Sequence, residues 1–364
     1  MINYLNRLGG GVLFSALAVL FASATAQADS IDPAAFTADL DVGESVTIRK
    51  TVTVDTALDT GLIDVMFLFD TSGSMGDEID AAKAAAADIL TGLSAFGDLA
   101  SGTGYYSEPG AEGLFRDLST DTTTQLASID AITLGLGGGG GDFPELGFEG
   151  VEEAAEGASW RPGSNRFVIA FGDATFKELN GFTEASALEA LNDNNATFLG
   201  LDFGSMLSSI GITPQFLADE TGGSITDSSA SASEIVDDIV ALVDTAVSEY
   251  SAVTLDDFSA GLPNITLDVE CVSADIGTCD GAFARGDFDR STDRDFMFDV
   301  TFTRVAAGST SFDTFALVDG AIVAAERDTF PGSTGGGGPR VPAPGAAYLL
   351  ALGLLLLRRR AVRA

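Results

Sequence analysis

One short stretch of the chain, residues 62–78, limits the possible folds more than any other part of the sequence. It reads LIDVMFLFDTSGSMGDE, and all of its first eight residues except Asp64 are bulky and apolar. A short, nearly unbroken apolar run predicts a strand that is buried on both faces, as in a parallel sheet flanked by helices. The run stops at Asp70, so we expect the strand to end there, with a tight turn at Gly73.

Three hard oxygen donors stand on alternate residues at the end of this strand: Asp70, Ser72 and Ser74. Carboxylate and hydroxyl oxygens, with no sulfur or imidazole beside them, suit Mg²⁺ or Ca²⁺. Open α/β sheets also bind ligands in the loops outside the carboxyl ends of their strands. The alternative is a Ser/Gly turn that caps a helix starting near Asp77. The position between a buried strand and a helix favours the metal site.

Strands and helices alternate along residues 58–250. Apolar runs predict two further buried strands, at 166–171 and 196–203, and helical patterns occupy 79–96, 146–158, 184–193 and 233–250. This alternation predicts an α/β fold with a doubly wound, mostly parallel sheet.

Residues 102–141 carry weaker signals. A strand is expected at 102–107, and 109–141 look like a loop with a short helical piece near 125–129. The glycine run at 137–141 is not followed by the Gly-Lys-Ser/Thr of a phosphate-binding loop, so we reject that interpretation.

The segments on either side of the α/β region have a different pattern. Residues 31–57 and 251–330 contain alternating apolar and polar residues, which is typical of antiparallel strands. We expect these two segments to form one β-sandwich domain, with the α/β domain of residues 58–250 inserted into it.

Charge and residue usage exclude several functions. Residues 29–330 hold 12 basic and all 54 acidic residues, a formal charge of −42, which disfavours nucleic acid and anionic membranes as partners. The chain has no histidine, so Ser-His-Asp and Cys-His catalysis and the usual zinc sites are excluded. The two cysteines, Cys271 and Cys279, are close in sequence, and in an exported protein we expect them to form a disulfide.

Both ends of the chain resemble targeting segments. Residues 1–28 have one basic residue, an apolar run and a final Ala-Gln-Ala, which predicts a secretory signal peptide. A membrane-spanning helix is the alternative there, but the apolar run is short for one. At the other end, a glycine-rich linker at 331–340 precedes a final segment of residues 341–364.

That final segment resembles the PEP-CTERM sorting signals of Gram-negative bacteria. It contains Val-Pro-Ala-Pro at 341–344, an apolar run at 345–357 and three arginines at 358–360, in that order. The resemblance implies recognition by an exosortase-type enzyme and a location at the cell envelope, cell surface or extracellular matrix. The protein would then contact the membrane only through this segment. A plain C-terminal anchor is the alternative.

The sequence around Asp70 resembles the metal-ion-dependent adhesion site of von Willebrand factor type A domains, with Asp70, Ser72 and Ser74 in the family's positions. The resemblance covers residues 60–250 and is greatest to the integrin β-subunit branch. In that branch a D-x-P-E segment and an Asp after a later strand complete the site, as Glu145 and Asp173 would here. The resemblance implies Mg²⁺ or Mn²⁺ at the central position.

The resemblance also implies two neighbouring cation sites, with Ca²⁺ as the candidate ion. Asp77 and Glu78 match the acidic pair of the adjacent site, and Glu108 and Asp142 match a flanking site. Gly140 stands where the family has an Asn ligand, which weakens the match at the flanking site.

These observations predict a protein that is not an enzyme. We expect a divalent-metal-dependent adhesion or matrix-binding protein, whose metal has one open position for an acidic residue of a protein or matrix ligand. The alternatives are a structural or sensing protein with a purely stabilising metal, and a metal-dependent hydrolase.

Overall fold

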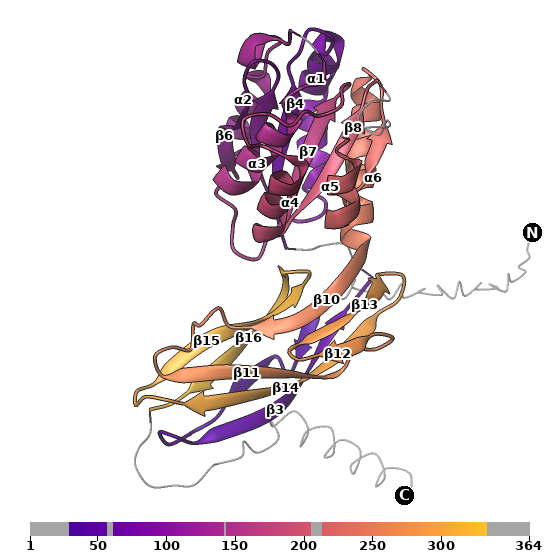
Figure 1. The fold of residues 1–364 in the computed structure, drawn as a ribbon. Coiled ribbons are helices and arrows are strands. Elements are labelled where there is room, and N and C mark those ends of the chain that lie inside the picture. Colours follow the sequence, from indigo (N-terminus) through magenta and orange to yellow (C-terminus); the bar gives the residue numbers. More distant parts are fainter. Residues whose placement is uncertain (1–28, 57–60, 142, 205–212, 333–364) are drawn as a thin grey trace, which may run out of the picture.

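The computed structural model describes residues 29–56, 61–141, 143–204 and 213–332 (Figure 1). An α/β unit lies above a second unit built from antiparallel strands in this view. The predicted signal peptide, the C-terminal sorting segment and most of the glycine-rich linker lie outside the described residues. No helix in the described part of the chain is long and apolar enough to cross a membrane.

A six-stranded sheet forms the middle layer of the α/β unit, with the order β6-β5-β4-β7-β8-β9. Its strands are β4 (Leu62–Asp70), β5 (Asp98–Tyr106), β6 (Glu112–Ser119), β7 (Asn165–Gly172), β8 (Ala196–Asp202) and β9 (Ile225–Asp227). All neighbours pair in parallel except β5 and β6. In this doubly wound order the chain changes its direction of winding between β4 and β7. The predicted fold class is therefore confirmed.

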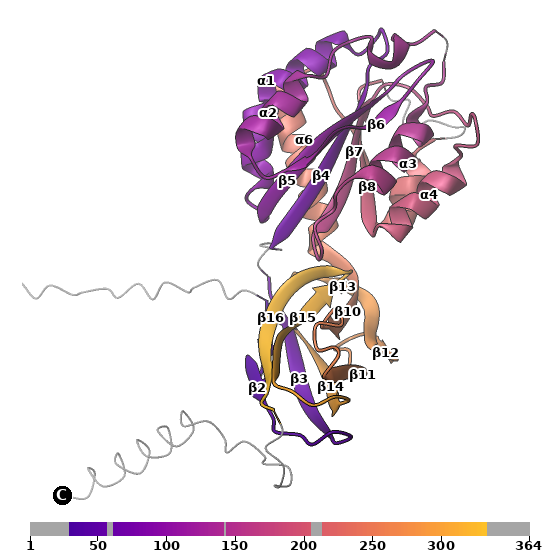
Figure 2. The same cartoon turned by 90° about the vertical axis from the view of Figure 1, so that its left-hand side faces the viewer.

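Helices cover both faces of this sheet (Figure 2). On one face, α1 (Gly76–Leu93), α2 (Thr122–Asp130) and α6 (Ala232–Ser248) pack on a core that includes Val65 and Phe67. On the other face, α3 (Gly147–Gly157), α4 (Glu184–Asp193) and α5 (Gln215–Thr221) pack on Met66 and Leu68. Successive residues of β4 point to opposite faces, so a strand between two helical layers must be apolar throughout.

The short helical piece expected near 125–129 is α2, but the expectation of a loop over the rest of 109–141 was wrong in part, because β6 lies there. β6 pairs irregularly with β5, which begins four residues earlier than expected. The strands approach closely: a Cβ at Gly104 would lie 2.1 Å from Gly113 O, and one at Gly102 would lie 2.5 Å from Arg116 O. The glycines that weaken the strand pattern in the sequence are therefore required by this close pairing.

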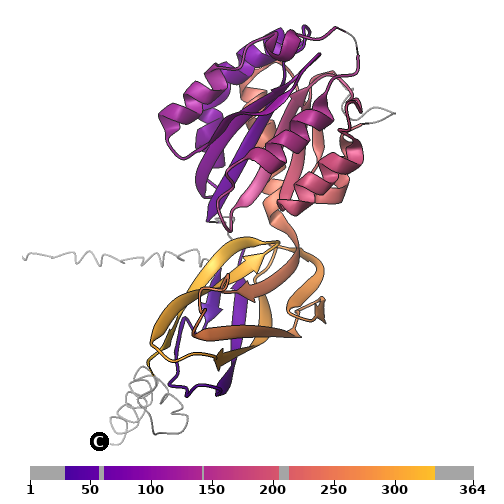
Figure 3. The ribbon, with the colours of Figure 1, turned by 60° about the vertical axis from the view of Figure 1, so that its left-hand side comes forward.

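The second unit has two sheets, which we call the sandwich (Figure 3), and their strands are antiparallel except where β2 pairs with β16. The first sheet has the order β1-β3-β14-β11: β1 (Ser30–Asp32), β3 (Ser45–Val54), β14 (Arg294–Arg304) and β11 (Ile265–Ser273). The second has the order β12-β13-β10-β15-β16-β2: β12 (Thr278–Asp280), β13 (Phe283–Asp289), β10 (Glu249–Asp256), β15 (Thr310–Val318), β16 (Ala321–Phe330) and β2 (Ala35–Thr37). β3 pairs with β14 over its whole length, so strands from before and after the α/β unit share a sheet.

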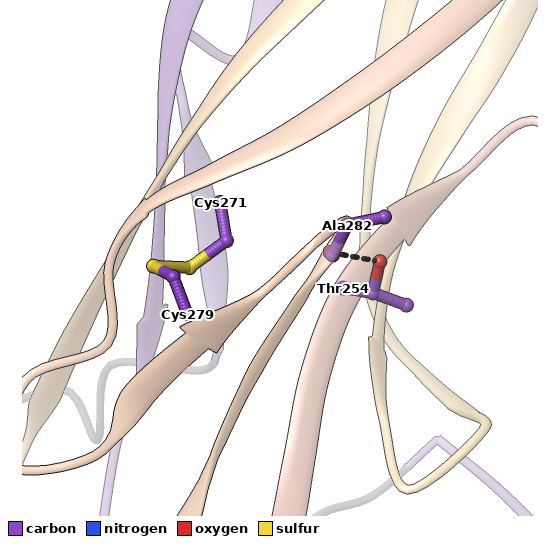
Figure 4. The surroundings of a disulfide bond; sticks show 4 residues. All are labelled: Thr254, Cys271, Cys279 and Ala282. Carbon is purple, nitrogen blue, oxygen red and sulfur yellow. Dashed lines mark hydrogen bonds between the residues drawn. A yellow bond between two sulfur atoms is a disulfide. The ribbon is translucent and has the colours of Figure 1, made fainter.

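A disulfide joins Cys271 on β11 to Cys279 on β12, as predicted (Figure 4). The two strands belong to different sheets, so this bond links the two layers of the sandwich. It lies beside the turn that joins β12 to β13. In this turn Ala282 O accepts a hydrogen bond from Thr254 Oγ1, which lies on β10.

The sandwich contacts the amino end of the parallel sheet. Ile322, at the start of β16, donates its N–H to Gly163 O at 2.8 Å, and a Cβ on Gly61 would lie 3.3 Å from Ile322 O. β4 thus starts beside the sandwich. At the usual rise per residue, its other end at Asp70 lies about 26 Å further away.

Candidate metal site

The loop after β4 holds one buried carboxylate in a fixed position. Asp70 is fully buried, and its Oδ1 accepts the Ser72 N–H at 2.8 Å. The second oxygen, Oδ2, is also buried and has no hydrogen-bond partner in the described part of the chain. The hydroxyl oxygens of Ser72 and Ser74 lie 3.3 Å apart. The turn therefore gathers three oxygen-bearing side chains at the carboxyl end of the strand.

The other two predicted ligands come from elsewhere in the chain to the same place. Glu145 precedes α3, and its backbone forms an isolated parallel bridge with Phe176. Asp173 directly follows β7, the neighbour of β4 across the switch point of the sheet. One cavity of about 410 Å³ contains side chains of four predicted ligands in its wall: Ser72, Ser74, Glu145 and Asp173.

The glycine run forms another wall of this cavity, which is lined by residues 139–141 as well. A Cβ on Gly138 would lie 2.5 Å from Glu108 O, and one on Gly140 would lie 3.1 Å from Glu145 Oε1. Thr71 Oγ1 donates to Leu136 O at 2.7 Å and fixes the run against the β4 loop. The glycines therefore allow backbone to pass close to the candidate ligands.

The site concentrates negative charge in a buried place. Burial raises the pKa of Asp70 to about 7; the nearby Asp173 raises it further, and hydrogen bonds from Ser72 oppose the change. The pKa of Tyr106 is raised well above its usual value by burial and by the surrounding carboxylates, among them Asp70, Asp173 and Glu145. These carboxylates are therefore close enough together to change the pKa values of the same buried groups.

Two buried oxygens make this region suitable for a cation. Asp173 Oδ1, like Asp70 Oδ2, is buried and has no hydrogen-bond partner among the described residues. Buried polar atoms are normally paired, and an unpaired carboxylate oxygen is costly. A bound cation would satisfy both atoms, so the residues present fit a metal ion.

Carboxylates alone do not make this site. In the described residues, no group of three or more Asp, Glu or Cys side chains is placed to hold an ion between them. An ion here would need the serine hydroxyls and water as further ligands. Mg²⁺ accepts that arrangement because it retains several waters in protein sites.

The residues of the two predicted neighbouring sites have different surroundings. Asp77 and Glu78 lie in the first turn of α1, and Glu78 Oε2 is buried with no hydrogen-bond partner in the described residues. Glu108 forms an ion pair with Lys177, whose positive charge competes with a cation at the flanking site. Asp142 lies outside the described residues. Both neighbouring sites remain predictions.

Sequence reasoning missed Asp202, which ends β8 and is buried at the same edge of the sheet. Its carboxylate is one of those that raise the pKa of Tyr106. The signal was available, because an acidic residue ends an apolar strand there just as Asp70 ends β4.

Comparison with known proteins gives partial likenesses in structure only. No protein-family model matches the chain, and no curated protein matches it. It is similar to a von Willebrand factor type A protein from Catenulispora acidiphila, with 13% identity and a TM-score of 0.41, over 85% of this chain and 75% of that one. It is also similar to the pilus adhesin SpaC from Lactobacillus rhamnosus GG in its open conformation, with 12% identity and a TM-score of 0.38, over 80% of this chain and 46% of that one.

A further likeness is to proximal thread matrix protein 1 from the mussel byssus. The identity is 19% and the TM-score 0.37, over 55% of this chain and 48% of that one. The chain thus spans about half the length of the pilus adhesin and of the mussel protein.

Proposed function

We propose that this protein is a non-catalytic adhesion or matrix-binding protein that binds its partner through a divalent cation at the carboxyl end of β4. One observation carries the proposal: Ser72, Ser74, Glu145 and Asp173 line one cavity beside the buried Asp70, and two carboxylate oxygens there have no hydrogen-bond partner among the residues that the structure describes. The proposal agrees with the resemblance of the Asp70 loop to the adhesion motif of von Willebrand factor type A domains.

Each residue has a distinct part in this mechanism. The Ser72 N–H orients the Asp70 carboxylate through one oxygen, and the other oxygen would be available to bind an ion. The hydroxyls of Ser72 and Ser74 would add neutral oxygen ligands, while Glu145 and Asp173 would supply charge directly or through water. The bound cation would supply positive charge and an open coordination position for a carboxylate of the partner.

The surroundings of the cavity provide a surface for such a partner. Phe143 lines the cavity and its side chain is 50% exposed. Leu134, also about half exposed, lies on the same side, where its Cδ2 is 3.8 Å from a Cβ built on Gly76. An acidic residue flanked by apolar side chains would use both features, because apolar contacts add to the metal–carboxylate bond.

Attachment of the chain fits this role. The cavity lies at the end of β4 away from the sandwich, whereas the last strand of the sandwich, β16, leads into the predicted linker and sorting segment. A protein held at the cell surface by its C-terminal side would present the cavity outward.

Binding to extracellular matrix of the producing organism tests the function. Immobilised wild-type protein should retain a matrix component in millimolar Mg²⁺ and release it in EDTA. Asp70→Asn should retain little in either buffer, while the exposed-residue control Asp237→Asn should behave as wild type. Retention that is equal in Mg²⁺ and EDTA would instead support a stabilising metal or no metal.

The two terminal segments need a separate test. The intact mass of protein extracted from the producer's surface should correspond to a chain that starts at Asp29 and ends near Val341. A mature protein that keeps the apolar run at 345–357 would contradict the sorting hypothesis.

A further inference from the structure

A lysine is completely buried inside the sandwich. The chain has three lysines, Lys50, Lys83 and Lys177. Lys50 lies on β3 with its side chain 0% exposed, between the inward-facing residues of the two sheets. Lysine is among the residues least often buried, because taking its charge out of water is costly. Neighbouring groups must therefore compensate for the cost of burying the Lys50 amine.

Two carboxylates from the last strand surround the amine. Glu326 and Asp328 both point inward from β16, and their side chains are also 0% exposed. Lys50 Nζ forms an ion pair with Glu326 Oε1 and donates a hydrogen bond to Asp328 Oδ1 at 3.2 Å. The other oxygen of Asp328 accepts a hydrogen bond from Thr314 Oγ1 at 2.5 Å.

Glu326 differs from Asp328 in its other contacts. Both of its carboxylate oxygens are buried and accept no hydrogen bond from the described residues. Asp328 is held from both sides by Thr314 and Lys50, whereas Glu326 contacts the amine without further support. The geometry thus gives the two carboxyl groups different roles.

The cluster lies in an aromatic environment. The Phe302 ring is centred 5.0 Å from Lys50 Nζ, and the buried rings of Phe36, Phe312 and Phe330 pack around Phe302. Burial lowers the pKa of Lys50 to about 8 and raises the pKa of Asp328. A low-polarity site favours the neutral amine and the neutral carboxylic acid over the charged pair, and the neutral amine is the nucleophile.

We propose that Lys50 and Glu326 condense to form an intramolecular amide bond across the sandwich. The Lys50 Nζ lone pair attacks Cδ of the protonated Glu326 carboxyl, which forms the C–N bond. Asp328 takes the proton from the nitrogen and delivers it to the departing hydroxyl, which leaves as water. The step consumes an amine and a carboxylic acid, releases one water and needs no oxidant, reductant or other reactant.

The fold provides what this reaction requires. It holds the amine against the acid, which replaces a bimolecular encounter by an intramolecular step. The closed core excludes water, which disfavours the reverse hydrolysis. The amide that forms cannot ionise, so the reaction also removes from the core two groups whose charged forms are costly to bury.

The bond would join the two sequence segments that form the sandwich. β3 precedes the inserted α/β unit and β16 follows it, so the bond would link two residues that are 276 positions apart in the sequence (326 − 50). Tension between a bound partner and the C-terminal attachment would then pass through a covalent link between the sheets. This inference does not depend on the metal site.

Mass spectrometry of the purified full chain tests the proposal. After allowance for the disulfide and the observed termini, the wild-type mass should be about 18 Da, one water, below the mass of its sequence. Fragmentation of a protease digest should yield a branched peptide in which Lys50 is bonded to Glu326. An unmodified wild-type mass, or a branch at another residue, would overturn the assignment.

Two variants and a control test the chemistry. Lys50→Met should abolish the mass deficit, and Asp328→Asn should abolish it while keeping the volume of the side chain. Lys177→Met, which removes the other lysine that contacts a glutamate, should keep the full deficit. A deficit that persists in Lys50→Met would refute the bond, and one that persists in Asp328→Asn would refute the role of Asp328. Because the wild-type mass is decisive by itself, failure of a variant to fold does not affect the outcome.

Discussion

Replacement of Asp70 by Asn tests the reasoning about the metal site most directly. Asn keeps the shape of the side chain and can still accept the Ser72 N–H, but it cannot ionise. Burial, assisted by Asp173, raises the pKa of Asp70 from 3.8 to about 7. A difference of about three pH units corresponds to about 4 kcal/mol of unfavourable free energy for the ionised carboxylate in the metal-free fold.

The sign of the pH dependence follows from this change in pKa. Between about pH 4 and pH 7 the folded chain keeps a proton on Asp70 that the unfolded chain has lost. The free energy of unfolding of the metal-free protein should therefore fall as the pH rises through this range, and the full penalty is present above it. In EDTA at about pH 8, Asp70→Asn should melt several degrees higher than the wild type, because it lacks this penalty.

Magnesium should raise the melting temperature of the wild type and so narrow its difference from Asp70→Asn. An ion at a hundred times its Kd stabilises the folded state by about 2.7 kcal/mol, which raises the melting temperature of a domain of this size by roughly 5–10 °C. Calorimetry in EDTA and in Mg²⁺ should show this increase for the wild type and for Asp237→Asn, a control that removes an exposed carboxylate from α6. The increase should be absent from Asp70→Asn.

Two results would refute the reasoning. Equal increases for the wild type and Asp70→Asn would mean that Mg²⁺ acts only by screening the formal charge of −42 on residues 29–330. A metal-free wild type that is no less stable than Asp70→Asn above about pH 7 would mean that the Asp70 carboxylate carries no burial penalty.

Three further predictions concern single features of the fold. Asp173→Asn should lose most of the Mg²⁺-dependent increase in melting temperature, whereas an unchanged increase would remove Asp173 from the site. Gly140→Ala would place a Cβ 3.1 Å from a carboxylate oxygen of the cavity, and we expect calorimetric titration to show Mg²⁺ binding weakened by about tenfold. Gly135→Ala is its control, because it has a similar positive φ and open space around the new Cβ; equal weakening in both would point to loop strain alone. Alkylation of unreduced, denatured protein should label neither Cys271 nor Cys279, and replacing both by Ser should cost about 2–3 kcal/mol in urea unfolding, so labelling of both would exclude the bond in solution.

Features that depend on local pattern could be predicted from the sequence alone. The apolar run of β4 predicted a strand buried on both faces, and the alternation that follows predicted the doubly wound sheet. The disulfide could be predicted because its cysteines are only eight residues apart. In each case neighbouring residues carry the whole signal, since periodicity and short spacing do not depend on distant contacts.

The candidate metal site could be predicted only in part from local pattern. The loop after β4 shows three oxygen donors in five residues, but no local rule places Glu145 or Asp173 beside them. Their selection required the resemblance to a known family, and their position in one cavity follows from the pairing of β4 with β7. Strand β6 was missed for a related reason: its register depends on glycines that let two backbones approach, and glycine weakens a strand pattern.

The surroundings of Lys50 could be known only from the folded chain. The alternation of β3 places residue 50 on the same side as Val52 and Val54, so the sequence puts a lysine among inward-facing positions. It does not indicate which groups would compensate for the charge there. Those groups are on β16, at the other end of the sandwich sequence, and they meet Lys50 only when the two sheets pack together. Burial of a charge is costly everywhere, but its compensation depends on contacts between residues far apart in sequence, which only the folded chain brings together.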